Sequence, residues 1–232
     1  MAAWTLAFDA DDTLWHNESL FAITQKQFAE LLAPYADPER IENQLNEAER
    51  RNLRYFGYGV KGFVLSMIET AIELSDGRVT AREIQTILEA GKSMLTHPIE
   101  LLPGVRDTLT RLNASHNLMM ITKGDLFHQE SRIAMSGLGE LFSAIEVVSE
   151  KDAATYSRIL KRYHLRPENF LMVGNSIRSD ILPVLELGAR AVYIPYAITW
   201  VHEQADLSGA DPERWAQLES IAELPAWLQS LD

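Results

Sequence analysis

Three acidic residues stand together near the start of the chain, directly after a short apolar run. The run covers residues 4–8 and is typical of a buried strand, and Asp9, Asp11 and Asp12 follow it. Residues two apart in an extended chain point the same way, so Asp9 and Asp11 can converge on one site. Such a cluster needs positive charge, and a hard cation such as Mg²⁺ prefers oxygen ligands of this kind. The segment predicts metal-assisted chemistry, although an Asp-rich turn or helix cap has a similar composition.

The composition excludes several classes of protein. The chain has 232 residues, a formal charge of −12, 47% hydrophobic residues and no cysteine. Without cysteine there are no disulfides, thiolate metal sites or cysteine nucleophiles. The acidic balance argues against a nucleic-acid partner, because that binding rests on Lys and Arg. No run reaches the roughly 20 apolar residues of a membrane span, and no secretory signal precedes the first strand. We therefore expect a cytoplasmic protein.

Residues 16–100 show helical spacing of apolar residues and few signals for strands. Breaks fall at residues 34–38, 57–62 and 76–77, which leaves four helical segments. Four helices of this length form a small bundle. The sequence predicts a helical domain over 16–100, inserted into a second domain made of residues 1–15 and 101–232.

From about residue 100, short apolar runs alternate with helical patterns. Strands are expected at 118–121, 144–148, 170–173 and 191–194, and helices at 104–113, 126–137, 153–163 and 178–188. This alternation is typical of an α/β fold, a parallel sheet with helices on both faces. The strand at 5–9 joins the same sheet. The tail adds a possible strand near Ser220 and Ile221 and a last helix from about residue 225.

Polar side chains follow four of the expected strands at their carboxyl ends, where ligands bind in an open α/β sheet. The residues at these strand ends are Asp9 and Asp11, then Thr122, Lys123 and Gly124, then Lys151, and finally Asn175 and Asp180. The carboxyl ends of parallel strands share one edge, so these four groups should meet. A chance acidic turn would not bring the other three groups with it.

This set, in this order, resembles the haloacid dehalogenase (HAD) superfamily, which is mostly phosphatases. The resemblance rests on Asp9-x-Asp11-x-Thr13-Leu14, Thr122, Lys151 and Gly174-Asn175-Ser176 with Asp180, and it covers nearly the whole chain. It implies a Rossmann-like core. The insertion resembles the helical cap of the branch that includes phosphoglycolate phosphatase and haloacid dehalogenase.

The resemblance assigns roles to four residues. Asp9 matches the nucleophile, which forms an aspartyl-phosphate, and Asp11 matches the general acid and base. Thr122 matches the hydroxyl that hydrogen-bonds a phosphoryl oxygen. Lys151 matches the lysine that neutralises the nucleophile and the transferred phosphoryl group.

The resemblance also implies Mg²⁺, held by Asp9, Asp11, Asn175 and Asp180. Asn175 stands where an aspartate is more usual. Its amide oxygen can still ligate Mg²⁺, but the site carries one negative charge fewer, which should weaken metal binding. Three roles are open for Asp180: direct ligation, holding a metal-bound water, or orienting Lys151.

Substrate contacts are expected in two places. Gly124 lets the backbone approach a phosphoryl group, and Lys123 beside it faces either substrate or solvent. Arg54 and Lys61 belong to a run of positive and aromatic residues around three glycines. We place this run between the second and third helices of the insertion, where a loop could contact the leaving group.

These residues favour a Mg²⁺-dependent phosphatase acting on a small phosphorylated metabolite. Phosphoryl transfer of the β-phosphoglucomutase type uses the same residues and stays open. C–halogen hydrolysis needs no acid for its leaving group, so Asp11 argues against it, and only Asn175 favours a non-catalytic phosphate-binding module. We expect no nucleic-acid or membrane partner, and a monomer or weak homodimer.

Overall fold

The computed structural model describes residues 4–198, 200–203 and 205–231. Its contacts divide the chain into two compact units. The α/β unit comprises Met1–Glu18 and Ile99–Asp232, and the helical unit comprises Ser19–Pro98.

The α/β unit is built on one six-stranded sheet with the order β3-β2-β1-β4-β5-β6. Every pair of neighbouring strands is parallel. The strands are β1 (Thr5–Phe8), β2 (Asn117–Lys123), β3 (Ala144–Val148), β4 (Phe170–Gly174), β5 (Arg190–Tyr193) and β6 (Trp215–Gln217). The chain runs outward from β1 to β3 and then returns to β4 on the other side of β1. The strand order therefore reverses between β1 and β4, which is where open α/β sheets bind ligands.

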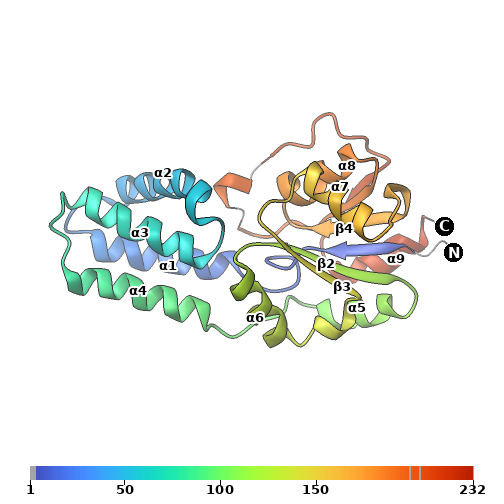
Figure 1. Ribbon diagram of the computed structural model, residues 1–232, viewed down its shortest axis with the longest axis horizontal. Coiled ribbons are helices and arrows are strands. Elements are labelled where there is room, and N and C mark those ends of the chain that lie inside the picture. Colours follow the sequence, from blue (N-terminus) through green and yellow to red (C-terminus); the bar gives the residue numbers. More distant parts are fainter. Residues whose placement is uncertain (1–3, 199, 204, 232) are drawn as a thin grey trace. The chain divides into compact units, whose positions relative to one another are not determined.

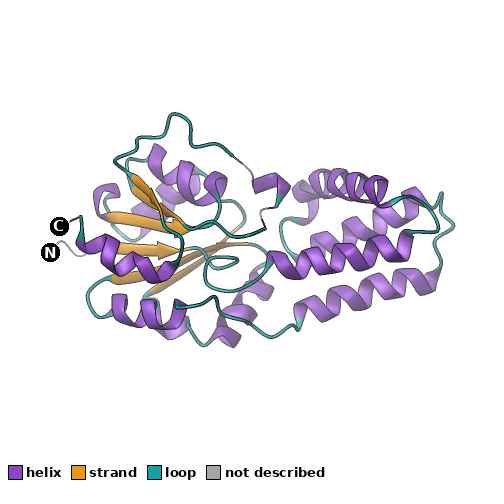
Figure 2. Cartoon of the chain, turned by 180° about the vertical axis from the view of Figure 1, so that it is seen from behind, coloured by secondary structure: helices purple, strands orange, loops and turns teal. Residues whose placement is uncertain are grey.

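Helices cover both faces of this sheet, as the alternation of strands and helices predicted (Figures 1 and 2). On one face lie α5 (Val105–Asn113), α6 (Leu126–Ser136) and α9 (Leu224–Gln229), and on the other lie α7 (Ala153–Arg162) and α8 (Leu182–Glu186). Side chains alternate along β1 between the two faces. Leu6 and Phe8 pack in the core that includes Leu109 of α5, whereas Ala7 packs in the core that includes Tyr156 of α7.

Two expectations for this unit were wrong in part. The sixth strand is Trp215–Gln217, paired with β5, and Ile221–Glu223 form a 3₁₀ turn instead of a strand. The helix expected at 178–188 is a π-helical turn, Ile177–Ile181, followed by the short α8. Pro183 has no N–H to donate to the carbonyl of Ser179 four residues earlier. The hydroxyl of Tyr156 donates to that carbonyl instead, at 3.0 Å.

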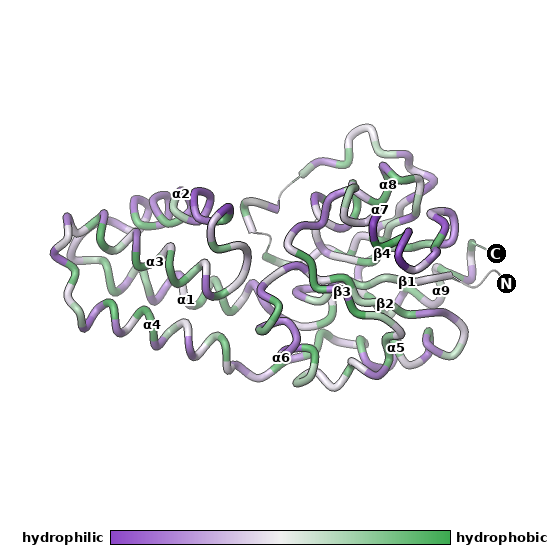
Figure 3. Tube along the Cα trace, viewed as in Figure 1, coloured by the Kyte–Doolittle hydropathy of each residue, from purple (hydrophilic) through white to green (hydrophobic). Residues whose placement is uncertain are grey.

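The helical unit consists of four helices that share one apolar core. They are α1 (Glu18–Leu32), α2 (Pro38–Phe56), α3 (Val60–Leu74) and α4 (Ala81–Leu95). Each contributes to that core, for example through Phe28, Leu45, Met67 and Ile87. Hydrophobic and hydrophilic residues alternate along these helices (Figure 3), as expected when one face of each helix is buried.

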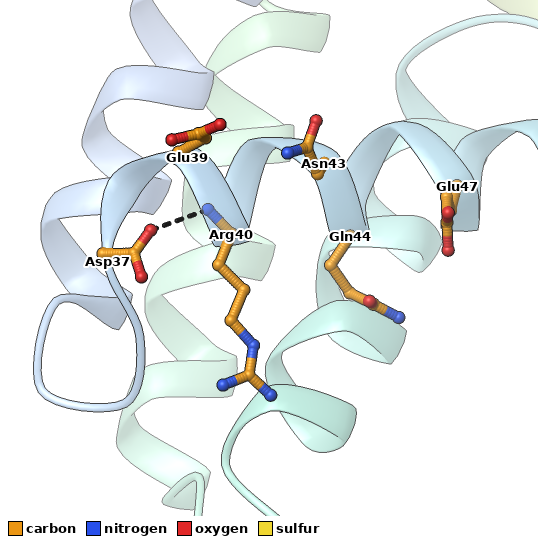
Figure 4. A pocket seen from close by; sticks show the side chains of 6 residues that line it. All are labelled: Asp37, Glu39, Arg40, Asn43, Gln44 and Glu47. Atoms are coloured by element: carbon orange, nitrogen blue, oxygen red, sulfur yellow. Dashed lines mark hydrogen bonds between the residues drawn. The ribbon is translucent and has the colours of Figure 1, made fainter.

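The start of α2 is fixed by a helix cap. The Asp37 carboxylate accepts the main-chain N–H of Arg40 at 2.9 Å, and Pro38 occupies the first helical position. A polar surface pocket lies over these first turns of α2 (Figure 4). Its lining residues are Asp37, Glu39, Arg40, Asn43, Gln44 and Glu47, and none of them is a candidate for the chemistry predicted above.

The loop between the second and third helices is shorter than the break expected at residues 57–62. Because α2 continues to Phe56 and α3 begins at Val60, Arg54 lies on α2 and Lys61 lies on α3. Gly62 is inside α3. A Cβ at this position would lie 2.7 Å from the carbonyl oxygen of Gly57, which explains why the residue is glycine. Its glycine therefore marks a close approach of two backbones, and not a continuation of the loop.

Among the described residues, no helix combines the length and apolar character that crossing a bilayer would require.

Candidate active site

The candidate site lies at the carboxyl edge of the sheet, where the strand order reverses. Asp9 directly follows β1, and Asn175 directly follows β4. The two strand ends are tied together, since the N–H of Asp9 donates to the carbonyl of Val173 at 2.9 Å. The two adjacent strands thus bring together side chains that are more than 160 residues apart in sequence.

A buried charge cluster joins Asp9, Lys151 and Asp180. The Nζ of Lys151 lies 2.5 Å from Asp9 Oδ1 and 2.7 Å from Asp180 Oδ1. The other oxygen of Asp180 accepts the main-chain N–H of Ser176 at 3.0 Å. Both carboxylate oxygens of Asp180 therefore have donors, and this arrangement orients Lys151 toward Asp9. Gly174 is required here, because a Cβ at that position would lie 2.2 Å from Asp180 Oδ2.

Burial governs the electrostatics of this cluster. It raises the pKa of Asp9 to about 7, because the loss of hydration outweighs the attraction of Lys151. Burial also works against the charged form of Lys151, but the carboxylates of Asp180 and Asp9 outweigh it and raise the pKa of Lys151 well above its usual value. The lysine is therefore a fixed positive charge beside Asp9.

Oxygen atoms converge on the other side of Asp9. One terminal atom of the Asn175 amide lies 3.2 Å from Asp9 Oδ2, 3.1 Å from the main-chain carbonyl oxygen of Asp11 and 3.2 Å from Thr13 Oγ1. As an NH₂ group, this atom donates hydrogen bonds to these oxygens. If it is the amide oxygen, it faces two atoms that can only accept hydrogen bonds, Asp9 Oδ2 and the Asp11 carbonyl oxygen. A cation between these three oxygens would then be coordinated by all of them.

The Asp11 side chain is held by partners outside this group of oxygens. Its Oδ1 accepts the indole N–H of Trp15 at 2.7 Å and lies 2.8 Å from Nη1 of Arg132. Its Oδ2 accepts the amide N–H of Gln129 at 3.1 Å. Asp11 thus presents its main-chain carbonyl to Asn175 and its carboxylate to a separate set of donors.

Asp12 has a structural position. It is buried with φ of 61°, and its carboxylate accepts the main-chain N–H groups of Asn17 and Glu18 at 2.8–3.0 Å. These bonds hold the segment that joins β1 to α1. Burial raises its pKa to about 7 although Glu18 N–H opposes the shift. The three acids of the opening motif therefore have three different environments.

Thr122 and Gly124 lie at the end of β2. Thr122 is buried, and its hydroxyl accepts an N–H of Gln129 at 2.6 Å. Gly124 has φ of 151°, a conformation that other residues rarely adopt. A Cβ at Gly124 would also lie 3.2 Å from the side chain of Gln129.

Lys123 is tied into an ion-pair network. Its Nζ lies 2.5 Å from Glu203 Oε1, 3.3 Å from Glu150 Oε1 and 3.1 Å from Ser179 Oγ. The structure therefore places Lys123 against carboxylates, close to the loop that presents Asn175 and Asp180. Arg54 and Lys61 belong to the helical unit, where the guanidinium of Arg54 lies 4.5 Å from the Tyr55 ring.

Sequence reasoning missed three residues of this region: Gln129, Arg132 and Glu203. Gln129 and Arg132 are three apart on α6, so they lie on one face of that helix. Glu203 lies in the long connection from β5 to β6, residues 194–214, and connections of that length are uncommon in compact domains. That length was the only sequence signal that pointed to Glu203.

No carboxylate-rich metal cluster is present in the part of the chain that the structure describes, since no three Asp, Glu or His side chains gather there. Of the four predicted ligands, Asp9 and Asn175 face each other. Asp11 joins them through its main-chain carbonyl, and Asp180 is bonded to Lys151 and Ser176 instead.

The sheet, its two layers of helices and the acid–lysine cluster at the reversal of strand order are typical of an α/β enzyme, with a candidate active site at the carboxyl edge. The sequence model of the haloacid dehalogenase-like hydrolase family matches residues 5–188 of this chain. A haloacid dehalogenase-like family hydrolase from Xanthomonas campestris is 44% identical, with a TM-score of 0.88 over 100% of this chain and 92% of that chain.

More distant relatives match over nearly the whole chain. The glyceraldehyde 3-phosphate phosphatase of Pyrococcus furiosus is 25% identical over 231 residues, which cover 97% of this chain and 91% of that protein. The magnesium-bound structure of the putative HAD-hydrolase YfnB from Bacillus subtilis is 18% identical, with a TM-score of 0.66 over 98% of this chain and 99% of that chain. The chain belongs to the haloacid dehalogenase-like hydrolase family.

Proposed function

We propose that this hydrolase is a Mg²⁺-dependent phosphatase that cleaves a small phosphomonoester through an aspartyl-phosphate on Asp9. The observation that supports this most is the position of Asp9, which is buried with Oδ1 against the ammonium of Lys151 and Oδ2 3.2 Å from the Asn175 amide. The phosphatase of Pyrococcus furiosus, related over nearly the whole chain, supports the same class of substrate.

The oxygens around Asp9 fit a magnesium ion. Mg²⁺ binds oxygen at about 2.0–2.1 Å in an octahedron, so its neighbouring ligand oxygens lie about 3 Å apart. The Asn175 amide atom lies 3.2 Å from Asp9 Oδ2 and 3.1 Å from the Asp11 carbonyl. We assign these three groups as ligands, with the amide oxygen turned toward the ion. The magnesium-bound YfnB structure supports the choice of metal. When bound, Mg²⁺ would offset the negative charge of the phosphoryl group.

The chain's own residues account for the two steps of hydrolysis. In the first step, a carboxylate oxygen of Asp9 attacks phosphorus, the bond from phosphorus to the ester oxygen breaks, and Asp11 gives its proton to the departing alkoxide. In the second step, Asp11 takes a proton from water, whose oxygen attacks phosphorus and releases Asp9 and inorganic phosphate. Lys151 supplies positive charge beside the reacting oxygens throughout. Thr122 and the N–H at Gly124 bind phosphoryl oxygens.

We assign residues 1–15 and 101–232 to the catalytic core and residues 16–100 to a helical cap. On this assignment Arg54 and Lys61 contact the substrate from the cap. The substrate is a small phosphorylated metabolite. We also propose a cytoplasmic monomer or weak homodimer that binds neither nucleic acid nor membrane, and the acidic composition supports the absence of a nucleic-acid partner.

The test is a screen of phosphate monoesters with and without Mg²⁺, run on the wild type and on Asp9→Asn. We expect activity that depends on Mg²⁺ and falls by about 10⁴-fold in Asp9→Asn, because the amide cannot act as the nucleophile. Acid quenching during turnover of a ³²P-labelled substrate should leave label on the wild type and none on Asp9→Asn. Circular dichroism should show that both proteins are equally folded.

Other outcomes of this screen would identify other functions. If Asp9→Asn is as active as the wild type, the activity belongs to a contaminant, and a phosphate-binding module without catalysis becomes the better interpretation. Transfer of the label to an added sugar would indicate a phosphotransferase. Halide release from 2-haloacids, with no activity on any phosphate, would indicate a dehalogenase.

A further inference from the structure

We propose that Arg132 is a positioning residue for Asp11, holding its carboxylate where it can exchange a proton with the leaving group. This inference rests on the role of general acid and base proposed above for Asp11. Arg132 has no part in that proposal, and no motif of the sequence pointed to it.

The contacts of the Asp11 carboxylate show how tightly it is held. Arg132 Nη1 and the indole N–H of Trp15 both reach Oδ1, at 2.8 and 2.7 Å, and Gln129 donates to Oδ2 at 3.1 Å. The Asp11 side chain is still 24% exposed, whereas that of Arg132 is 8% exposed. The donors therefore surround one side of the carboxylate and leave the other side open to a reacting group.

Arg132 also holds the chain just beyond the Asp11 motif. Its Nη1 donates to Asn17 Oδ1 at 2.5 Å, and its Nη2 donates to the carbonyl of His16 at 3.2 Å. Its guanidinium lies 5.7 Å from the centre of the Trp15 ring. One buried cation thus links Asp11 to the segment that joins β1 to α1, and the rigid fork of a guanidinium suits such multiple contacts.

Burying this arginine is costly unless its charge is paired, and Asp11 supplies the pairing charge. Helix α6 presents Arg132 and Gln129 on one face, three residues apart, and Gln129 contacts both Asp11 and Thr122. A misplacement of about 1 Å can cost an enzyme on the order of 100-fold in rate. A fixed helix that holds the acid beside the phosphate-binding hydroxyl would prevent such a misplacement.

The leaving group provides a test that a merely structural role would not satisfy. An alkoxide needs a proton as it departs, whereas a nitrophenolate departs without one. The parameter kcat/KM reports the steps up to departure of the leaving group, so it isolates the first use of Asp11. We therefore compare kcat/KM for glycerol phosphate, phenyl phosphate and 4-nitrophenyl phosphate in the wild type, Arg132→Met, Arg132→Lys and Asp11→Asn.

We expect Arg132→Met to lose about 100-fold on glycerol phosphate, at the low end of general-acid effects, and only a few-fold on 4-nitrophenyl phosphate. Asp11→Asn should show the same pattern more strongly. Arg132→Lys should recover part of the loss on glycerol phosphate, because it keeps the charge but not the fork of donors. If Arg132→Met does not fold, Arg132→Lys is judged by the same comparison of substrates.

Arg106→Met is the matched control. Arg106 donates to the carbonyls of Ser136 and Gly137, so it anchors the other end of α6 without approaching Asp11. The Arg106→Met substitution should change kcat/KM by the same factor for all three substrates. An equal loss on all three in Arg132→Met would overturn the inference. If that happens while Asp11→Asn still loses more kcat/KM on glycerol phosphate than on 4-nitrophenyl phosphate, the proposed function stands. If Asp11→Asn loses kcat/KM equally on all three substrates, Asp11 is not the general acid, and this inference is wrong as well.

Discussion

The two units of this protein treat charged side chains differently. The α/β unit buries five charged residues, each at most 7% exposed over the whole residue: Asp9, Asp12, Arg132, Lys151 and Asp180. In the helical unit, Glu49 is the one charged residue that is buried to the same degree within residues 19–98. Arg51 of that unit forms its ion pairs at the surface, where it contacts Glu69 and Glu73 with side-chain exposures of 37–40%.

The difference bears on why the α/β unit buries charged side chains and the helical unit mostly does not. Taking a charge out of water costs several kcal/mol, and well-packed apolar residues often stabilise a core better than a buried ion pair does. A unit selected only for stability should therefore resemble the helical unit. The buried charges of the α/β unit gather at the carboxyl edge of the sheet, where the proposed reaction would use Asp9 and Lys151.

The comparison is tested most strongly at Lys151. Lys151→Met leaves Asp9 and Asp180 together without their cation, so we expect a loss of about 3 kcal/mol in the free energy of unfolding. Phosphatase activity should fall by about 100- to 1,000-fold, because charge stabilisation of the transferred group is lost. Urea denaturation and steady-state kinetics measure the two effects. Lys161→Met is the control, since Lys161 is exposed on α7, and an equal loss there would contradict the comparison.

Glu203 should give an intermediate effect. Its carboxylate accepts hydrogen bonds from Ser176 and Ser179 and pairs with Lys123, each at 2.5 Å. We expect Glu203→Gln to cost about 2 kcal/mol, in the range for hydrogen bonds to a charged group. Apparent Mg²⁺ affinity should fall as well, because Ser176 and Ser179 belong to the loop that presents Asn175 and Asp180.

The effect of Glu203 should depend on pH with a definite sign. Burial opposes its charged form, but Lys123 and the two serine hydroxyls outweigh burial and lower the pKa of Glu203. A carboxyl whose pKa is lower in the folded state stabilises the fold above its unfolded pKa, about 4.3, and loses that contribution as the pH falls through its folded value. The difference in unfolding free energy between wild type and Glu203→Gln should therefore be largest above about pH 5 and shrink at lower pH. Glu213→Gln, an exposed change in the same connection, should show no such trend.

The sequence predicted the parallel sheet, its helical layers and the groups at four strand ends, because those signals are local. A run such as 170–173 identifies a strand by itself, and the shared edge of parallel strands then brings Asp9, Lys151 and Asn175 together. The last strand was misplaced because Trp215–Gln217 is only three residues long, and its pairing with β5 decides its structure.

Longer-range partners could not be predicted in this way. Arg132 and Gln129 look like ordinary polar residues of an amphipathic helix, and only the packing of α6 shows that both reach Asp11. The end of the expected strand at 118–121 predicted where Lys123 lies. Its partner, Glu203, belongs to the connection between β5 and β6, and no local sequence pattern predicts how that connection folds. The sequence thus identified the residues that follow the strands, and missed the residues that hold them in place.

The smallest effect is expected at Arg51 in the helical unit. Arg51 Nη2 lies 2.7 Å from Glu69 Oε1 and 3.0 Å from Glu73 Oε1, yet all three side chains are more than one-third exposed. Water already solvates such charges well, and exposed pairs typically contribute at most about 1 kcal/mol. We therefore expect Arg51→Gln to lower the free energy of unfolding by no more than about 1 kcal/mol, with the difference fading at high salt. Urea denaturation at low and high ionic strength measures both effects. A loss as large as that of Lys151→Met would show that the helical unit also depends on its charges, and the contrast between the two units would fail.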